Sequence, residues 1–143
     1  MLEIRDEQPD KLLHRTTIEA IIGASFEVRR ELGYGFLERV YQRALRIELI
    51  RRRATVELEK RIQVQYKGAV VGDYDLDLLV NGWVAVEIKV APQYDKREEA
   101  QLLNELKAIG LKVGMLVNFC RTKVEHNASS SKSVFHPCSS VAE

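Results

Sequence analysis

The chain has 143 residues, of which 45% are hydrophobic, and a net charge of +1. This length is enough for one hydrophobic core and too short for two sizeable domains. The near-zero charge excludes an indiscriminate polycation, so nucleic acid would have to bind a local basic patch. No apolar run approaches the ~20 residues that span a bilayer, and the charged first residues lack the apolar segment of a signal peptide. We therefore expect a cytoplasmic protein with no membrane contact.

The first predicted element is a helix over residues 16–32, preceded by an N-terminal extension of residues 1–15. Thr16 and Glu19 have the spacing of a capping box, in which a hydroxyl and a carboxylate satisfy free backbone N–H groups. Apolar residues recur at helical intervals, and Gly33 is placed to end the helix.

A second helix is predicted over residues 36–52, after a tight connection at residues 33–35. Its apolar residues form a broad stripe that would face a core. Glu38 lies at the edge of this stripe, so its carboxylate either meets solvent or points into a cleft. Several arginines give the helix a basic flank, which is either a solvated face or a contact for phosphate groups.

Three antiparallel strands should follow the helices. Residues 56–66 alternate between apolar and polar side chains, with an exception at Lys60, and this pattern is typical of a half-buried strand. Lys67 and Gly68 turn the chain into the next strand, which continues into a β-hairpin over residues 72–89.

The hairpin carries the residues with the most distinctive chemistry. Glu87 and Lys89 share one face of their strand, because successive side chains point to opposite faces. A two-residue loop at 81–82 would send Asp77 to the other face, whereas a three-residue loop at 80–82 would leave Asp77 and Glu87 on one face. We predict the three-residue loop, with its glycine in the left-handed conformation.

Two carboxylates and a lysine suit the hydrolysis of phosphodiester bonds. Carboxylate oxygens bind Mg²⁺ or Mn²⁺ and usually leave coordination positions for water and a substrate phosphate. Such an ion polarises the phosphoryl oxygen and lowers the pKa of a bound water, while Lys89 would orient that water or stabilise developing charge. The same residues would also suit a salt bridge on a solvated strand face, so the hairpin by itself leaves both interpretations open.

The next predicted elements are a helix and a strand. Asp95 and Glu98 mark a helix start at capping-box-like spacing, and Gly110 ends the helix. Residues 111–119 are strongly apolar, as expected of a strand that returns beside the hairpin through a right-handed crossover. The order of helix, helix, three strands, helix and strand predicts one α/β domain over residues 16–120.

Residues 121–143 differ in composition from the rest of the chain. They are rich in serine and other polar residues, and their apolar positions have no period. This composition predicts a polar, flexible C-terminal tail.

A set of short motifs occurs along the chain in a fixed order. They are Gly35-x-x-Glu38-x-x-Tyr41, Tyr66-Lys67-Gly68, Asp77, Glu87-x-Lys89, Gln101-Leu102-Leu103-Asn104, Leu106-Lys107 and Asn118-Phe119. This ordered set resembles the GxxExxY protein family of the PD-(D/E)XK nuclease superfamily, and it is far more specific than any one motif. The resemblance covers about residues 16–119.

The resemblance implies a restriction-endonuclease-like (PD-(D/E)XK) α/β core, in which a mixed central sheet is flanked by helices in the order ααβββαβ. It implies that Asp77 and Glu87 bind Mg²⁺ or Mn²⁺ and that Glu38 is the helix carboxylate that reaches the same metal. Lys89 would be the catalytic lysine, and Gln101 would be a helix glutamine lying against the catalytic sheet. The implied activity is that of a metal-dependent nuclease, with DNA as the expected nucleic-acid partner.

The chain departs from the family pattern in several places. Arg29 stands where family-like chains often carry His, a second His is expected near Glu98, and Glu105 replaces the Tyr of a Gln-x-x-x-Tyr pattern. A strand rich in Lys and Arg would be expected where residues 121–143 begin. These departures keep open a catalytically silent nuclease-fold module that binds nucleic acid or a protein partner. A homo-oligomer that presents two basic patches is a separate expectation for the partners of the chain. A structural α/β domain with a solvated acidic face is a third alternative.

Overall fold

The structure is a computed structural model of the chain and describes residues 9–92, 95–111, 113–120, 123–130 and 141–142. Its elements are α1 (Pro9–Leu32), α2 (Glu38–Arg51), β1 (Val56–Tyr66), β2 (Ala69–Val80), β3 (Val84–Lys89), α3 (Lys96–Ile109), β4 (Val113–Phe119), β5 (Lys123–Ser130) and β6 (Val141–Ala142). The predicted order ααβββαβ is confirmed, and two further strands follow it. No helix in the described ranges is long and apolar enough to cross a membrane.

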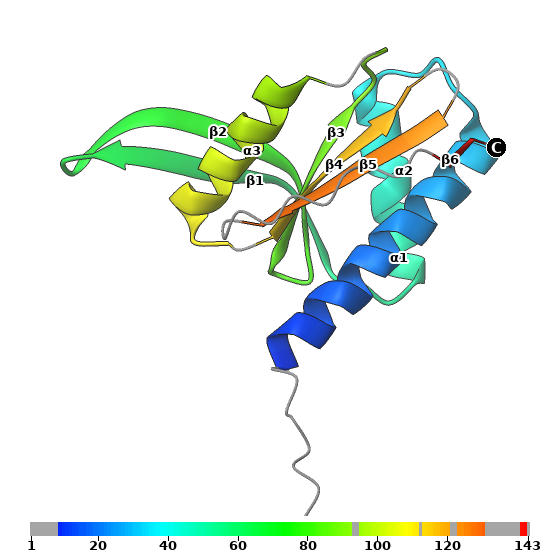
Figure 1. Cartoon of the computed structure of the whole chain (residues 1–143), viewed down its shortest axis with the longest axis horizontal. Helices are drawn as coiled ribbons and strands as arrows, with labels where there is room; N and C mark the ends of the chain where they lie inside the picture. The colour runs from blue at the N-terminus through cyan, green and yellow to red at the C-terminus, as the bar shows by residue number, and fades with distance from the viewer. Residues whose placement is uncertain (1–8, 93–94, 112, 121–122, 131–140, 143) are drawn as a thin grey trace, which may run out of the picture.

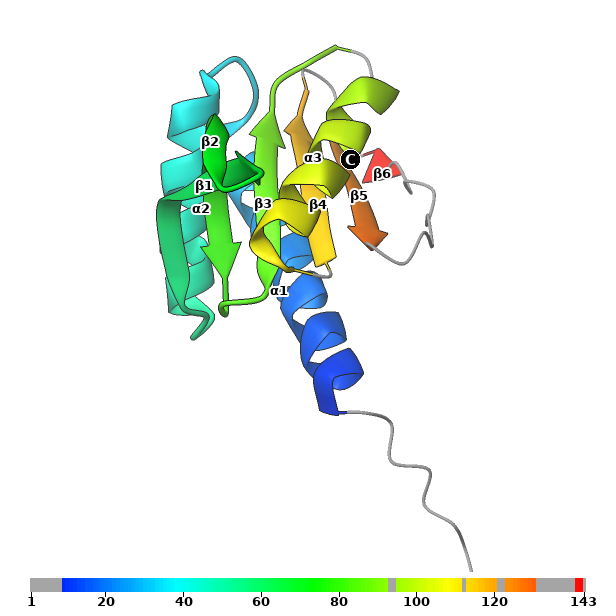
Figure 2. The same cartoon turned by 90° about the vertical axis from the view of Figure 1, so that its left-hand side faces the viewer.

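The strands form one mixed sheet in the order β1-β2-β3-β4-β5-β6. β1, β2 and β3 pair antiparallel, and β4 pairs parallel to β3 after the chain has crossed through α3. Helices α1 and α2 cover one face of the sheet, and α3 covers the other (Figures 1 and 2). This arrangement confirms the predicted α/β class.

Each face of the sheet has its own hydrophobic core, because side chains alternate along the central strands. Leu78 and Val86 pack in the core beneath α1 and α2. Leu79 and Ala85, one residue along, pack beneath α3 together with Leu102 of that helix. Asp77, Glu87 and Lys89 follow Leu79 and Ala85 in this alternation, so the sheet places them on the α3 face.

The helix ends follow local chemistry. Gly33 ends α1 with a φ of 71°, and its N–H donates to the Arg29 carbonyl over 2.9 Å. Asp95 caps α3 by accepting a 2.9 Å hydrogen bond from the Arg97 N–H, and Gly110 closes the helix with a φ of 73°. Both ends of α3 lie where the capping residue and the glycine predicted them.

The start of α1 was predicted wrongly. The helix begins at Pro9, not at Thr16, so residues 9–15 are helical and only residues 1–8 of the expected extension lie outside the described part. Proline is well accepted at the first helical position, because the N–H that it lacks has no partner there in any helix. Thr16 therefore lies inside α1, and its spacing to Glu19 does not mark a helix start.

The expected flexible tail also needs correction. Residues 123–130 form β5, which pairs antiparallel with β4 from Phe119↔Val124 to Val113↔Ser130. Backbone hydrogen bonding can recruit a polar segment to a sheet without any apolar period, so composition did not reveal this strand. Residues 121–122, 131–140 and 143 of the predicted tail lie outside the described residues.

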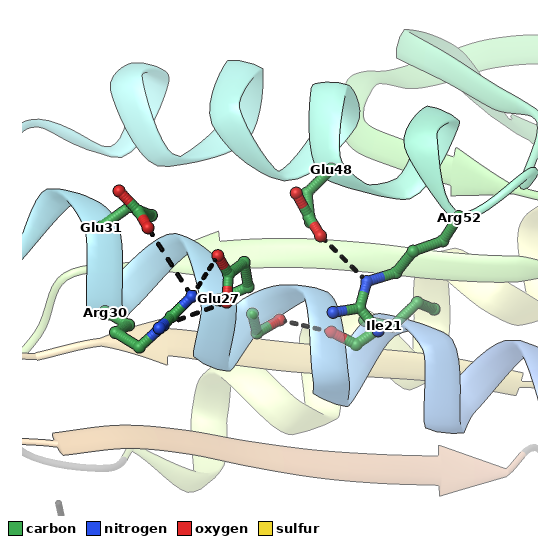
Figure 3. A network of polar contacts seen from close by, with 7 residues as sticks. Ile21, Glu27, Arg30, Glu31, Glu48 and Arg52 are labelled. Atoms are coloured by element: carbon green, nitrogen blue, oxygen red, sulfur yellow. Dashed lines mark hydrogen bonds and ion pairs between the residues drawn. The ribbon is translucent and has the colours of Figure 1, made fainter.

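Each of the two N-terminal helices carries polar contacts of its own where the helices lie side by side (Figure 3). Within α1, Arg30 forms ion pairs with Glu27 at 2.7 Å and with Glu31 at 3.6 Å. Arg52, which caps α2, pairs with Glu48 at 3.1 Å and reaches α1, where a Cβ added to Gly23 would lie 2.9 Å from its Nη1. Gly23 thus leaves the space in which the Arg52 guanidinium lies against α1.

Candidate active site

The β2–β3 turn determines which side chains share a face. Val80 pairs with Val84 and Leu78 with Val86, so the loop is residues 81–83. The predicted loop length of three residues is confirmed, but its position at 80–82 is wrong by one residue. The parity is the same in either case, and the next step of the observed register brings Asp77 opposite Glu87. A two-residue loop, which would have separated these carboxylates, is excluded.

This turn is anchored on two sides. Asn81 and Gly82 both have positive φ, of 54° and 77°. The Asn81 side chain accepts from the Thr55 N–H at 3.0 Å and donates to the Thr17 hydroxyl of α1 at 2.9 Å. The displacement of the loop by one residue therefore has a tertiary cause, because Asn81 is held at the first loop position by partners far away in the sequence.

Asp77 lies at a break in the β1–β2 ladder. The register pairs Leu58 with Leu78 and Lys60 with Leu76, but it omits Glu59 and Asp77 between them. Glu59 has a φ of 50°, in the left-handed region, which distorts β1 at this point. The Asp77 backbone is thereby released from β1 and bonds elsewhere.

The hydrogen bonds of Asp77 join it to β3 and to α2. Its N–H donates to Glu87 Oε1 at 3.3 Å, and its Oδ2 accepts from the Ile88 N–H at 2.7 Å. Its carbonyl accepts a 3.0 Å hydrogen bond from Gln42 Nε2. The two carboxylates are thus held side by side on adjacent strands, and both the main chain and the side chain of Asp77 are oriented.

Gln42 is a site residue that sequence reasoning missed. It is only 6% exposed, and it lies one helical turn after Glu38 on α2. A glutamine at a buried position of an otherwise apolar stripe was the available signal, since a buried amide needs a hydrogen-bond partner. Its partner, the Asp77 carbonyl, is 35 residues away in the sequence.

Glu87 carries the strongest electrostatic perturbation of the site. Burial raises the pKa of its carboxyl to about 9, and the nearby Asp77 and Glu105 carboxyls act in the same direction. Three acidic groups therefore repel one another in a half-buried place. A divalent cation would relieve this repulsion.

Glu38 lies in the same groove as Asp77. It begins α2, is exposed, and lines a groove of about 620 Å³ together with Asp77, Asp75 and Glu59. The structure brings Glu38 to this groove without assembling a complete metal cage. In the described part of the chain, no three His, Cys, Asp or Glu side chains are grouped closely enough to hold an ion as they stand.

The motif residue Tyr41 explains how Glu38 is positioned. The Tyr41 hydroxyl donates to the Gly33 carbonyl at 2.8 Å and accepts from the Phe36 N–H at 3.4 Å. Its ring stacks on Phe119 of β4, with the ring centroids 4.5 Å apart. Tyr41 therefore ties the loop before α2 to the sheet, and this loop leads directly to Glu38.

We expect Tyr41→Phe to lower the free energy of unfolding by about 1 kcal/mol, because it removes the hydroxyl that bonds this loop while keeping the stacked ring. Urea denaturation followed by circular dichroism measures the change. Tyr66→Phe is the matched control, since Tyr66 is 62% exposed at the tip of the β1–β2 hairpin. Equal stability of the two variants would show that the loop does not depend on the Tyr41 hydroxyl.

Helix α3 supplies Gln101 and Glu105 to the site. The exposed Gln101 donates from Nε2 to Glu105 Oε1 at 3.1 Å. Glu105 is 6% exposed, and burial raises the pKa of its carboxyl while the Gln101 hydrogen bond and the Lys89 charge lower it. Both residues line a small cavity with Glu87 and Lys89. In the sequence Glu105 was noted only as a departure from a family pattern, whereas the structure makes it part of the acidic cluster.

A family model described as the PD-(D/E)XK nuclease superfamily matches residues 15–129. The chain belongs to this superfamily. The match extends over residues 123–129 of β5, which agrees with the corrected extent of the sheet. No curated protein and no solved structure matches the chain significantly.

The donor groups fit a divalent metal of the kind that nucleases of this superfamily generally use. The side chains of Asp77, Glu87 and Glu38 offer carboxylate oxygens, which are typical ligands of Mg²⁺ and Mn²⁺. A metal would also supply positive charge next to Glu87, where burial and neighbouring acids disfavour the carboxylate. Mg²⁺ is often held by one or two carboxylates plus waters, so an incomplete protein cage does not argue against it.

Proposed function

We propose that this protein is a Mg²⁺- or Mn²⁺-dependent nuclease that hydrolyses phosphodiester bonds in DNA. Asp77, Glu87 and Glu38 hold the metal in this proposal. Lys89 is the catalytic lysine, and Gln101 is a supporting residue of α3. The observation that carries the proposal is the Asp77–Glu87 pair. Asp77 Oδ2 accepts a hydrogen bond from the Ile88 N–H at 2.7 Å, and Glu87 Oε1 accepts one from the Asp77 N–H at 3.3 Å.

The chemistry follows from the faces of the strands. Lys89 lies two residues after Glu87 on the same face of β3, and both line the small cavity beneath α3. Its ammonium would orient the attacking water or stabilise charge that develops on the phosphoryl oxygens. The bound ion would polarise the phosphoryl group and lower the pKa of a water. The fixed carboxylates limit the reorganisation that accompanies metal binding.

A groove beside the acidic cluster supports nucleic acid as the substrate. It measures about 900 Å³, lies between α3 and the β1–β2 hairpin, and includes Gln101 and Glu105. Arg97 and Lys107 contribute positive charge to its lining, and Tyr74 contributes an aromatic ring that is 41% exposed. Basic groups contact phosphates, and exposed aromatic rings stack on bases.

The proposal is tested by incubating supercoiled plasmid and labelled single-stranded DNA with the protein in Mn²⁺ or in EDTA. We expect cleavage in Mn²⁺, and we expect Asp77→Asn to reduce it to the level seen in EDTA. Glu57→Gln is the matched control, because Glu57 lies on β1 with its side chain 59% exposed. Cleavage by Asp77→Asn at the wild-type rate would reveal a contaminating nuclease. No cleavage in either metal or on either substrate would favour the silent binding module.

Finer assignments form part of the same proposal. The position of Tyr41 supports membership of the GxxExxY family, because its hydroxyl bonds to Gly33 and Phe36 in the loop that leads to Glu38. The proposed location is the cytoplasm, as expected from the charged first residues of the chain. Sequence-specific cleavage usually requires base-contacting elements beyond so small a core. We therefore expect the protein to select DNA by its structure, or to recognise it through a partner, including a second copy of the chain.

A further inference from the structure

The hydrophobic core beneath α3 ends where the β1–β2 hairpin extends past that helix (Figure 1). Ile62 and Leu76 of the hairpin are fully buried in this core. Tyr74 pairs directly with Ile62 across the two strands, yet it is 41% exposed, and Val64 is the next residue on the same face of β1. Val64 and Tyr74 line the groove of about 900 Å³ between the hairpin and α3, so this groove begins where the core ends.

The aromatic ring of Tyr74 has a defined place beside this groove. It lies over Gly72, two residues before it on β2, where an added Cβ would come within 3.2 Å of the ring. A side chain at residue 72 would therefore crowd the ring, and the glycine leaves the space that the ring occupies. The exposed part of the ring is available to a planar group, as in proteins that stack bases on aromatic side chains.

Helix α3 supplies the opposite wall of the groove. The residues that it contributes recur at helical intervals, so the wall follows the helix axis. Both ends of this wall are basic, and Arg97 and Lys107 are separated by about 15 Å at the 1.5 Å rise of a helix. The polar and small residues between these charges are Ala100, Gln101, Asn104 and Glu105.

The charges of this wall favour an anionic ligand. Arg97 and Lys107 outnumber the one carboxyl group of the lining, that of the buried Glu105. Arg97 pairs with Asp95 at 3.2 Å, but its side chain is 92% exposed, and so exposed an ion pair contributes little stability. The Arg97 guanidinium can therefore exchange Asp95 for a phosphate group at small cost.

The ring and the charges together distinguish a single strand from a duplex. In a duplex each base is paired and stacked on its neighbours, so a protein ring can stack only on a base that has left the duplex. A duplex could contact Arg97 and Lys107 through its phosphates, but it would offer Tyr74 no free base. An unpaired strand can use all three side chains at once.

The groove adjoins the candidate active site. Gln101 and Glu105 line the groove, and they also line the small cavity that contains Glu87 and Lys89. A strand that lies along α3 would therefore pass beside the acidic cluster.

We propose that the groove between α3 and the β1–β2 hairpin binds single-stranded DNA, with one base stacked on Tyr74 and flanking phosphates at Arg97 and Lys107. This inference rests on the proposed function, because it specifies the form of DNA that the nuclease selects. The protein binds an unpaired strand more tightly than a duplex, since only the unpaired strand uses both the ring and the charges. Cleavage follows the same preference.

The test is the affinity for a fluorescein-labelled oligo(dT) and for a blunt duplex of the same length, measured by fluorescence anisotropy in EDTA, where the metal-dependent reaction cannot occur. Wild type should bind the single strand about tenfold more tightly than the duplex. Tyr74→Ala should weaken single-strand binding about tenfold, the usual scale for the loss of one stacked base, and leave duplex binding unchanged. Tyr74→Phe keeps the ring and should bind within about twofold of wild type.

The charges are tested separately. Lys107→Ala should weaken single-strand binding and reduce the slope of log affinity against log salt concentration by about 0.7, as expected for one lost phosphate contact. The matched controls are Tyr66→Ala, at the exposed hairpin tip, and Arg43→Ala, at an exposed position of α2 on the other side of the sheet. Both controls should match wild type. Circular dichroism and the urea midpoint check that each variant is folded.

The outcomes separate this inference from the proposed function. Equal affinity of wild type for single strand and duplex would overturn the inference, and so would single-strand binding by Tyr74→Ala at the wild-type level. If either occurs while Mn²⁺-dependent cleavage is present in wild type and lost in Asp77→Asn, only this inference fails. If wild type binds the single strand through Tyr74 but cuts no DNA in Mn²⁺, the groove stands and the proposed nuclease does not. Absence of both binding and cleavage would overturn both.

Discussion

Lys89→Ala should lower the rate of Mn²⁺-dependent DNA cleavage by about 10²–10³-fold, the usual effect of removing one group that stabilises transition-state charge. Metal binding should persist, because Asp77 and Glu87 remain and a nearby positive charge has been removed. The half-buried Lys89 shares its strand face with Glu87, and both residues line the same small cavity. Initial rates on labelled DNA, together with Mn²⁺ calorimetry, measure the two effects separately.

Lys60→Ala is the matched control for this prediction. Lys60 lies on β1 with its side chain 50% exposed and pairs with Glu57 at 3.5 Å, so its removal should change the cleavage rate less than twofold. A Lys89→Ala variant that cuts at the wild-type rate would remove Lys89 from the catalytic machinery. A variant that loses Mn²⁺ binding together with cleavage would assign Lys89 a role in maintaining the site instead.

Glu87→Gln should stabilise the metal-free protein at pH 8 by about 2 kcal/mol and remove most of the stabilisation that Mn²⁺ gives the wild type. The pKa of Glu87 is raised to about 9 in the folded protein, from an ordinary value of 4.5. Between these values the folded state keeps a proton that the unfolded state has lost. The contribution of Glu87 to stability is therefore highest below about pH 4.5 and falls as the pH rises towards 9.

The amide introduced by Glu87→Gln would not ionise, and it could still accept the hydrogen bond from the Asp77 N–H, so the variant should show a shallower fall in stability with rising pH. Mn²⁺ at one hundred times its Kd should stabilise wild type by about 2.7 kcal/mol, with release of the Glu87 proton. Urea midpoints at pH 5, 7 and 8, with and without Mn²⁺, measure these effects. Glu57→Gln should follow wild type throughout.

A lower stability of Glu87→Gln at pH 8 without metal would contradict this account, because it would show that the carboxylate stabilises the metal-free fold. Stabilisation of Glu87→Gln by Mn²⁺ to the same extent as wild type would also contradict it. That outcome would be compatible with the raised pKa of Glu87 but would show that Glu87 does not bind the metal.

Local chemistry predicted several elements closely. β1 has the predicted bounds of 56–66, because the alternation of polar and apolar residues begins and ends within this segment. The bounds of α3 follow from Asp95 and Gly110, whose capping and left-handed conformations act within a few residues. Glu87 and Lys89 share a face for the same kind of reason, since strand alternation is also local.

Other features of the site depend on residues far apart in the sequence. Asn81 shifts the hairpin loop by one residue because it bonds to Thr55 and Thr17. Asp77 is oriented by Gln42 of α2 and by the distortion at Glu59, and neither follows from a pattern within one strand. β5 is a strand because it pairs with β4, although its composition predicted a tail.

The sequence by itself determined the order of the elements as far as β4 and the superfamily, and it singled out Asp77, Glu87 and Lys89 as candidate site residues, because periodicity, capping and motif spacing are local properties. Only the tertiary structure decided that Glu105 joins the acidic cluster and that Glu38 faces the groove of Asp77. Burial and electrostatic repulsion depend on distances through space between α2, the sheet and α3. These distances cannot be inferred from the spacing of residues along the sequence.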